Sequence, residues 1–167
     1  MINECGKNVC VPYVPSPVED VMQVLKKLNP RRGEVILEPG CADATNLKEA
    51  YNRFGLIGIG IELDEGRYNR AIENARELPI TIIYKSFADS KDEIASADYI
   101  YCYLLQSVNN EVIKPLVERY AKPGAWIISR HYTFEGWSPV FVEKGIYVYR
   151  KSPRRNIIQR ILEEWKR

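Results

Sequence analysis

Two acidic residues follow predicted strands at a spacing that suits nucleotide recognition. A strand is predicted over 34–37 and leads into Glu38-Pro39-Gly40, and a second strand, predicted over 57–61, ends at Glu62. Glu62 stands 22 positions after Gly40, close to the roughly 20 residues between a nucleotide-binding loop and its ribose-binding acid. A turn of small residues lets the backbone approach a ligand, and a carboxylate accepts hydrogen bonds from ribose hydroxyls. The pair predicts a site for a nucleoside-containing cofactor, with ordinary solvated strand ends as the plainer alternative.

The loop after the first strand separates two cofactor classes. It reads Gly40-Cys41-Ala42-Asp43-Ala44. It therefore has the first glycine of the dinucleotide pattern G-x-G-x-x-G but lacks the later ones, which make room for a pyrophosphate. S-adenosylmethionine carries no pyrophosphate, and Glu38 is placed to face its cationic amino-acid end. The loop favours S-adenosylmethionine, and an NAD-dependent oxidoreductase is the weaker alternative.

Strands and amphipathic helices alternate along most of the chain. Further strands are predicted over 80–84, 99–104 and 126–129, and helical apolar spacing is found over 18–28, 47–54, 68–75 and 112–120. This order predicts an α/β fold, namely a Rossmann-like, doubly wound, mostly parallel sheet of about seven strands with helices on both faces. The stretch 134–150 has no intervening helix and predicts a C-terminal antiparallel hairpin.

We expect a single domain over 1–167. Within it, 1–30 is predicted to form a lid segment and a helix, in which Ser16 caps the helix and Pro17 is its first residue. An amphipathic helix is predicted over 153–167.

Composition excludes several classes of protein. Hydrophobic residues make up 46% of the 167 residues, as in a globular domain, and no apolar stretch approaches the roughly 20 residues of a membrane span. The net charge of +2 argues against a dedicated nucleic-acid binder. The four cysteines form no C-x-x-C pair, so we expect reduced thiols, no metal site and a cytoplasmic location.

Five segments of the chain resemble one family of enzymes. They are Val11-Pro-Tyr-Val-Pro-Ser-Pro17, Leu37-Glu-Pro-Gly-Cys-Ala-Asp43, Gly58-Ile-Gly-Ile-Glu-Leu63, Tyr103-Leu-Leu-Gln-Ser-Val-Asn109 and the region from Ser129 to Pro139. In these segments the chain is similar to the archaeal protein-lysine methyltransferases. These are class I, seven-β-strand enzymes that use S-adenosylmethionine, and their relatives include mitochondrial lysine methyltransferases.

The resemblance implies roles for the matching positions. Tyr13 and Ser16 would close over the methionine end of the cofactor, and Tyr103, Leu104 and Asn109 would position the acceptor. The implied cofactor-binding residues are Tyr13, Ser16, Glu38, Gly40, Ala42, Asp43, Glu62, Leu63, Ser86, Phe87 and Tyr103.

The chain departs from the family at several of these positions. The family loop reads Asp-x-Gly-x-Gly-x-Gly, whereas Glu38, Gly40, Ala42 and Ala44 occupy those places here, and Ser86 stands where the family has Asn. We expect Ala42 and Ala44 at negative φ, where alanine carries no strain. We also expect Glu62 to face a crevice, so that Glu62→Ala leaves the stability of the unliganded protein unchanged.

The expected partner is a protein substrate with accessible lysines, and the expected oligomeric state is a monomer. RNA or a small molecule is the alternative acceptor, and a catalytically degenerate cofactor-binding module is the alternative to an enzyme. His131 is the only histidine. We interpret it as structural, because methyl transfer to a neutral amine depends mainly on alignment of the reacting atoms.

Overall fold

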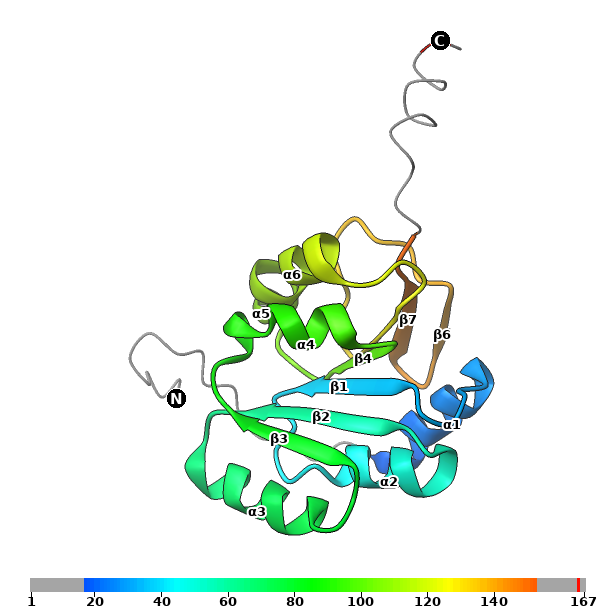
Figure 1. The fold of residues 1–167 in the computed structure, drawn as a ribbon. Helices are drawn as coiled ribbons and strands as arrows, with labels where there is room; N and C mark the ends of the chain where they lie inside the picture. Colours follow the sequence, from blue (N-terminus) through cyan, green and yellow to red (C-terminus); the bar gives the residue numbers. More distant parts are fainter. Residues whose placement is uncertain (1–16, 153–164, 166–167) are drawn as a thin grey trace.

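The computed structural model describes residues 17–152 and residue 165. In these residues one sheet of seven strands separates two helical layers (Figure 1). The strands are β1 (Val35–Pro39), β2 (Ile57–Glu62), β3 (Ile80–Tyr84), β4 (Tyr99–Cys102), β5 (Trp126–Arg130), β6 (Phe141–Glu143) and β7 (Ile146–Arg150). Their order is β3-β2-β1-β4-β5-β7-β6.

The first five strands are parallel, and β7 runs antiparallel to both β5 and β6. The chain moves outward from β1 to β3 and then crosses back to place β4 on the other side of β1. This reversal creates a topological switch point between β1 and β4, where parallel α/β sheets bind ligands. The predicted Rossmann-like sheet and its C-terminal antiparallel hairpin are therefore confirmed.

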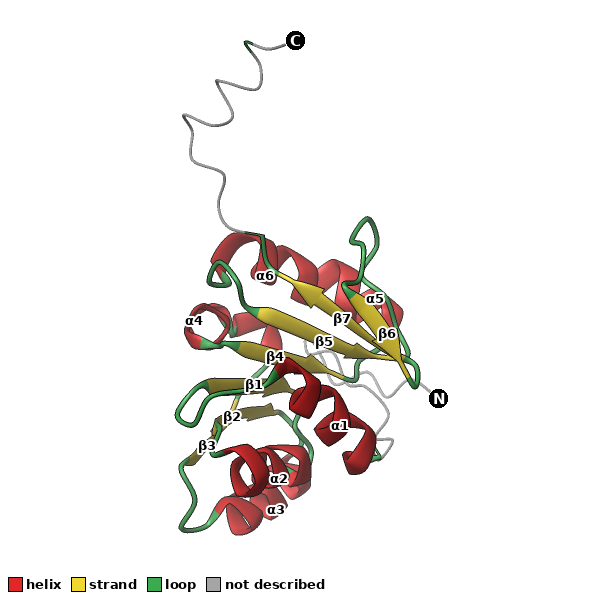
Figure 2. Cartoon of the chain, turned by 90° about the vertical axis from the view of Figure 1, so that its right-hand side faces the viewer, coloured by secondary structure: helices red, strands yellow, loops and turns green. Residues whose placement is uncertain are grey.

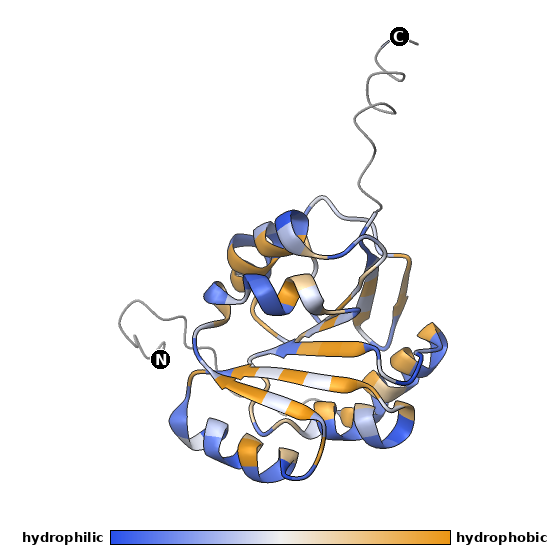
Figure 3. Cartoon of the chain, viewed as in Figure 1, coloured by the Kyte–Doolittle hydropathy of each residue, from blue (hydrophilic) through white to orange (hydrophobic). Residues whose placement is uncertain are grey.

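Helices cover both faces of the sheet (Figures 1 and 2). One layer contains α1 (Val18–Leu28), α2 (Thr45–Phe54) and α3 (Glu65–Ala75). The other contains α4 (Lys91–Ser96), α5 (Gln106–Val108), the π-helical segment η2 (Asn109–Ile113) and α6 (Lys114–Tyr120), and a short 3-10 turn, η1 (Phe87–Asp89), precedes it. The apolar strands lie between helices whose outward faces are hydrophilic (Figure 3), as expected for a sheet buried on both sides.

Several predicted boundaries change in the structure. Helix α1 begins at Val18 with Pro17 at its cap position, and it ends where Asn29 adopts a left-handed conformation before Pro30. Ser16 and the predicted lid over 1–16 lie outside the described residues, as does the predicted helix over 153–167 apart from residue 165. Within the described residues, no helix is long and apolar enough to cross a membrane.

Candidate functional site

The carboxyl ends of β1, β2 and β4 meet at the switch point. Glu38 pairs with Gly60 across β1 and β2, and Glu62 is the last residue of β2. Gly40 follows β1 with a φ of +72°, and a Cβ built on it would lie 3.2 Å from Leu104 Cδ2. The loop after β1 therefore contacts the loop after β4, and Gly40 supplies a backbone conformation that is unfavourable for other residues.

Glu38 is a buried carboxylate with one free oxygen. Its side chain is 5% exposed, and Asn46 Nδ2 donates to Oε1 at 2.8 Å. Within the described residues, neither Glu38 Oε2 nor the buried Asn46 Oδ1 has a hydrogen-bond partner. Burial raises the pKa of Glu38 to about 8, the Asn46 hydrogen bond opposes this shift, and the nearby carboxylates of Asp43 and Glu62 add to it. A buried carboxyl oxygen and a buried amide oxygen without partners are each able to accept from a cationic or hydrogen-donating group.

Glu62 is held by three backbone N–H groups from two loops. Ala42 N–H donates to Oε2 at 3.0 Å, and Leu63 and Asp64 N–H each donate to Oε1 at 2.9 Å. Arg67 Nε lies 3.5 Å from Oε1. Glu62 is 6% exposed, and its three backbone partners argue against the expectation that its removal leaves stability unchanged. The carboxylate holds the loop after β1 against the loop after β2 and retains limited capacity for another donor.

Ala42 and Ala44 both have positive φ, of 50° and 62°, so the expectation of negative φ is wrong. The hydrogen bond from Ala42 N–H to Glu62 requires this path of the loop, and the methyl group of Ala44 is fully buried in the core. Cys41, just before Ala42, packs against β2, because a Cβ built on Gly60 would lie 2.6 Å from its Sγ. These interactions outweigh the left-handed backbone strain of two alanines.

Asp43 stabilises the start of α2. Its Oδ1 accepts hydrogen bonds from the N–H of Thr45 at 3.1 Å and from the Thr45 hydroxyl at 2.8 Å. Asn74 Nδ2, from α3, donates to the Asp43 carbonyl at 2.8 Å. The carboxylate therefore fixes the loop near Glu38, and a direct cofactor contact by Asp43 stays a prediction.

The residues assigned to the adenine side follow β2 and β3. Leu63 is half-buried, and Ser86 Oγ accepts a hydrogen bond from Ala88 N–H at 3.3 Å at the start of η1. Phe87 is 6% exposed, and its side chain belongs to the apolar core between the sheet and the α4–α6 layer. A contact between Phe87 and adenine stays a prediction.

Three residues were predicted to position the acceptor, and two of them directly follow β4. Tyr103 is half-buried, with its ring 5.5 Å from that of His131 and 5.8 Å from the Arg130 guanidinium, and Leu104 is buried beside Gly40. Asn109 is fully buried in η2, and its Nδ2 donates to Ser129 Oγ at 2.9 Å. Asn109 therefore links η2 to β5 and does not reach an open surface.

Sequence reasoning missed the polar residues that support the site. Asn46 lies on the first turn of α2, where it can reach back to β1, and its position just after the loop was the available signal. Arg130 is 6% exposed, and its Nη1 and Nη2 each donate to Asp20 of α1 at 3.4 Å. The burial of this arginine could not be predicted from the sequence. Tyr13 and Ser16 lie outside the described residues.

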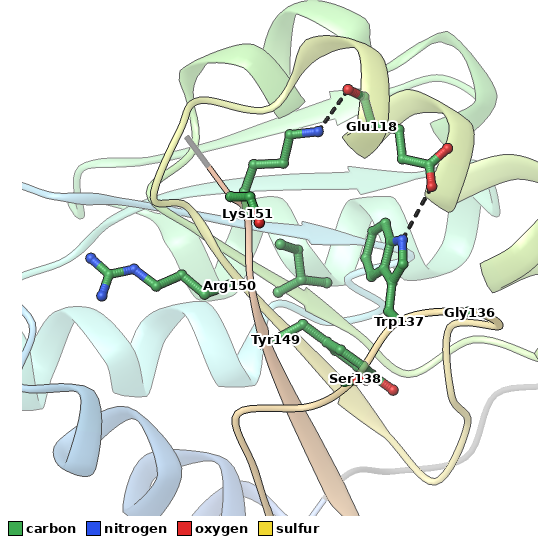
Figure 4. Close-up of a pocket in the computed structure, with 9 residues that line it drawn as sticks. Glu118, Gly136, Trp137, Ser138, Tyr149, Arg150 and Lys151 are labelled. Carbon is green, nitrogen blue, oxygen red and sulfur yellow. Dashed lines mark hydrogen bonds between the residues drawn. The ribbon is translucent and has the colours of Figure 1, made fainter. Parts of the chain in front are cut away.

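A separate cavity of about 510 Å³ lies beside the amino end of β5 (Figure 4). There Trp137 Nε1 donates to the Glu118 carboxylate at 3.1 Å, and Lys151 Nζ donates to the Glu118 carbonyl at 2.7 Å. Its residues come from α6, β7 and the loop before β6, so it is not part of the site at the carboxyl ends of the strands. Within the described residues, no group of three His, Cys, Asp or Glu residues is arranged to hold a metal ion.

No protein-family model matches the chain. Among curated proteins, a protein-lysine N-methyltransferase of Saccharolobus islandicus is 28% identical over 152 residues, which cover 83% of this chain and 92% of that protein. Among solved structures, an RNA methyltransferase of Salinibacter ruber in complex with S-adenosylhomocysteine superposes with a TM-score of 0.75 and 25% identity, covering 86% of this chain and 96% of that one.

A further solved structure shares only the fold. It is a methyltransferase of Geobacter sulfurreducens in complex with S-adenosylhomocysteine, with a TM-score of 0.57 and 21% identity over 68% of this chain and 47% of that one. The chain therefore has the fold of S-adenosylmethionine-dependent methyltransferases.

Proposed function

We propose that the chain is an S-adenosylmethionine-dependent methyltransferase that methylates lysine side chains of proteins. The observation that carries the proposal is the pair of buried carboxylates, Glu38 and Glu62, at the switch point of the sheet. Likeness to proteins whose structures contain S-adenosylhomocysteine supports the cofactor. The Saccharolobus islandicus relative supports lysine as the acceptor.

The residues at the site fit this cofactor. Glu38 Oε2, which is buried and lacks a partner in the described part of the chain, would accept a hydrogen bond from the ammonium group of the methionine end. Glu62 already accepts three hydrogen bonds from backbone N–H groups, and it would use a remaining acceptor position for a hydrogen bond from a ribose hydroxyl. When bound, the cofactor supplies a methyl group activated by attachment to a sulfonium sulfur. Tyr13 and Ser16 remain proposed contacts on the same side.

The protein's part in the reaction is alignment and exclusion of water. Tyr103 and Leu104 follow β4 and form the part of the site that an acceptor nitrogen would approach. A lysine must release its proton to water before its nitrogen accepts a methyl group, and the half-buried ring of Tyr103 would form one wall beside the amine. Alignment of donor and acceptor in a desolvated site supplies most of the rate in such a reaction.

The Salinibacter ruber neighbour makes RNA the second candidate acceptor. A catalytically degenerate cofactor-binding module stays the alternative to an enzyme, because Ala42 and Ala44 adopt a positive φ that favours glycine. Our proposal of an enzyme requires that the cofactor binds this loop with both methyl groups in place.

Calorimetry with S-adenosylmethionine, S-adenosylhomocysteine and NAD tests the cofactor, and we expect the first two to bind and NAD not to bind. Incubation with radiolabelled S-adenosylmethionine and a cell lysate then tests the acceptor. We expect labelled protein bands that disappear when lysines are chemically blocked beforehand. Label in nucleic acid alone would support a methyltransferase but reject lysine as its acceptor. If neither S-adenosylmethionine nor S-adenosylhomocysteine bound in calorimetry, the proposed cofactor would be rejected.

A further inference from the structure

A groove of about 700 Å³ opens beside the proposed reaction site. One wall begins at Leu105, the residue after Leu104, and continues through α5 into η2. The other wall is the segment that follows β5. We call it the acceptor groove, and we define it by Leu105, Gln106, Asn110, Glu111, Tyr132 and Glu135.

Side-chain amides join the two walls. Gln106 and Thr133 exchange two hydrogen bonds, in which Thr133 N–H donates to Oε1 at 3.1 Å and Nε2 donates to the Thr133 carbonyl at 3.0 Å. Asn110 Oδ1 accepts from Glu135 N–H at 2.7 Å, and its Nδ2 donates to the Gln106 carbonyl at 2.9 Å. The groove is therefore fixed before any ligand arrives, which lowers the entropic cost of binding.

The charge of the groove is negative. Glu111 and Glu135 are exposed, and within the described residues neither carboxylate forms an ion pair or a hydrogen bond. No described Lys or Arg lines the groove. Lys114 contacts the edge of the groove, where its Nζ donates to the Glu135 carbonyl at 2.5 Å and lies 3.9 Å from Glu118. Leu105 adds an apolar surface that is 40% exposed.

We propose that the acceptor groove binds the residues flanking the target lysine and selects polypeptide segments rich in Lys and Arg. This inference rests on the proposed function, because it names the substrate class of the same site. A basic side chain can place its aliphatic stem on Leu105 and its charge near Glu111 or Glu135. The phosphates of RNA would face two carboxylates that form no ion pair in the described part of the chain, and like-charge contacts of this kind disfavour a partner.

Binding to the full chain tests the groove without requiring methyl transfer. The probes are a short fluorescein-labelled peptide with one lysine flanked by arginines, the same peptide with glutamines as flanks, and an RNA oligonucleotide of similar length. By fluorescence anisotropy at low salt we expect the arginine-flanked peptide to bind most tightly. The double variant Glu111→Gln, Glu135→Gln should weaken it by about two- to tenfold, as expected for two exposed charge contacts, and should reduce its salt dependence.

Asp92→Asn is the matched control, since it removes one exposed carboxylate from α4 and leaves the groove intact. We expect it to bind the peptide like the wild type, and we expect cofactor affinity to be unchanged in all variants. Equal binding of both peptides, or an arginine-flanked peptide that binds the double variant as well as the wild type, would overturn the groove assignment.

Tighter binding of the RNA than of either peptide would also overturn it. Peptide binding that depends on Glu111 and Glu135 without any methyl transfer to lysine would support the groove while rejecting the proposed reaction.

Discussion

At the scale of single residues, Glu62 has two tasks that compete for the same oxygen atoms. It holds Ala42, Leu63 and Asp64 through their N–H groups, and in the proposed function it also accepts a hydrogen bond from ribose. A carboxylate has about four acceptor positions, so three backbone bonds leave room for only one strong additional donor. The acid that recognises the ligand is therefore also the residue that shapes the loop around it.

We predict that Glu62→Ala lowers both stability and cofactor affinity. Three N–H groups lose their acceptor, and a hydrogen bond to a charged group contributes about 1.5–3 kcal/mol net of the competing bonds to water, although water can enter the space that the variant leaves. We expect the unliganded protein to lose roughly 2–4 kcal/mol in urea unfolding. Glu62→Gln, which keeps one carbonyl oxygen, should lose less. An Ala variant as stable as the wild type would show that these three bonds contribute nothing.

The alanines of the loop give a second prediction at this scale. Ala42→Gly should raise the free energy of unfolding by up to about 1 kcal/mol, because relief of left-handed strain exceeds the extra entropy of the unfolded chain. Ala44→Gly is the matched control and should be nearly neutral, because it also removes a fully buried methyl group. Calorimetric cofactor affinity should remain within about twofold in both, since the backbone already follows the glycine path. A large gain in affinity would mean that the methyl groups occupy ligand space.

At the scale of elements, close packing between β2 and the cofactor loop fixes their separation. A Cβ added at Gly60 would lie 2.6 Å from Cys41 Sγ and 2.9 Å from Ile82 Cδ1, so this strand position excludes any side chain. Gly60 also pairs with Glu38. The close contact with Cys41 therefore fixes the distance between the loop after β1 and strand β2.

We predict that Gly60→Ala destabilises the fold by about 2–3 kcal/mol through overpacking. Cys41→Ala removes the closest atom, so the cost of Gly60→Ala should fall by about 1 kcal/mol in that background, which a double-mutant cycle in urea measures. Gly58→Ala is the control on the same strand. Its nearest contacts would be 3.1 Å, to Ile80, and we expect a smaller loss. Additive effects of Cys41→Ala and Gly60→Ala would contradict the direct contact.

Element types could be predicted where the apolar pattern was strong. The strand over 80–84 was predicted to the residue, because Pro79 precedes a run of β-branched residues. Helix α4 was missed, since its six residues contain only one buried apolar side chain, Ile94. The helix after β4 was predicted as regular, but the structure has a π-helical turn over Asn109–Ile113, which places the Asn109 amide against Ser129.

The site was predictable in position but less so in its contacts. Glu38 and Glu62 could be placed at strand ends because parallel strands end at one edge of a sheet. The partners of Glu62 could not, because they depend on how two loops fold toward each other. The positive φ of Ala42 and Ala44 was missed for the same reason, since backbone strain is imposed by tertiary contacts and not by residue type.

At the scale of the whole molecule, buried and paired carboxylates give opposite responses to pH. The hydrogen bond from Lys144, with support from Arg130, lowers the pKa of Asp20 from its ordinary 3.8. Burial opposes a similar shift at Glu34, but the Arg31 N–H and the Tyr99 hydroxyl together lower its pKa below 4.5. Both groups stabilise the fold above their ordinary pKa, and this contribution is lost as the pH falls through the folded-state pKa. Glu38 has the opposite sign, because its pKa is raised from 4.5 to about 8.

We predict that the unliganded protein is most stable near pH 5 and becomes less stable as the pH rises to about 8. The contribution of neutral Glu38 is fully present below 4.5 and is lost through about 8, because the unfolded chain releases its proton first. The slope can reach about 1.4 kcal/mol per pH unit while one proton separates the two states. Urea unfolding across this range measures it, and Glu38→Gln should remove the decline, because glutamine does not titrate and can still accept from Asn46. Bound S-adenosylmethionine should flatten the wild-type curve as well, since its ammonium group favours the ionised carboxylate. If the stability of Glu38→Gln declined with pH as steeply as that of the wild type, another group would be responsible for the pH response.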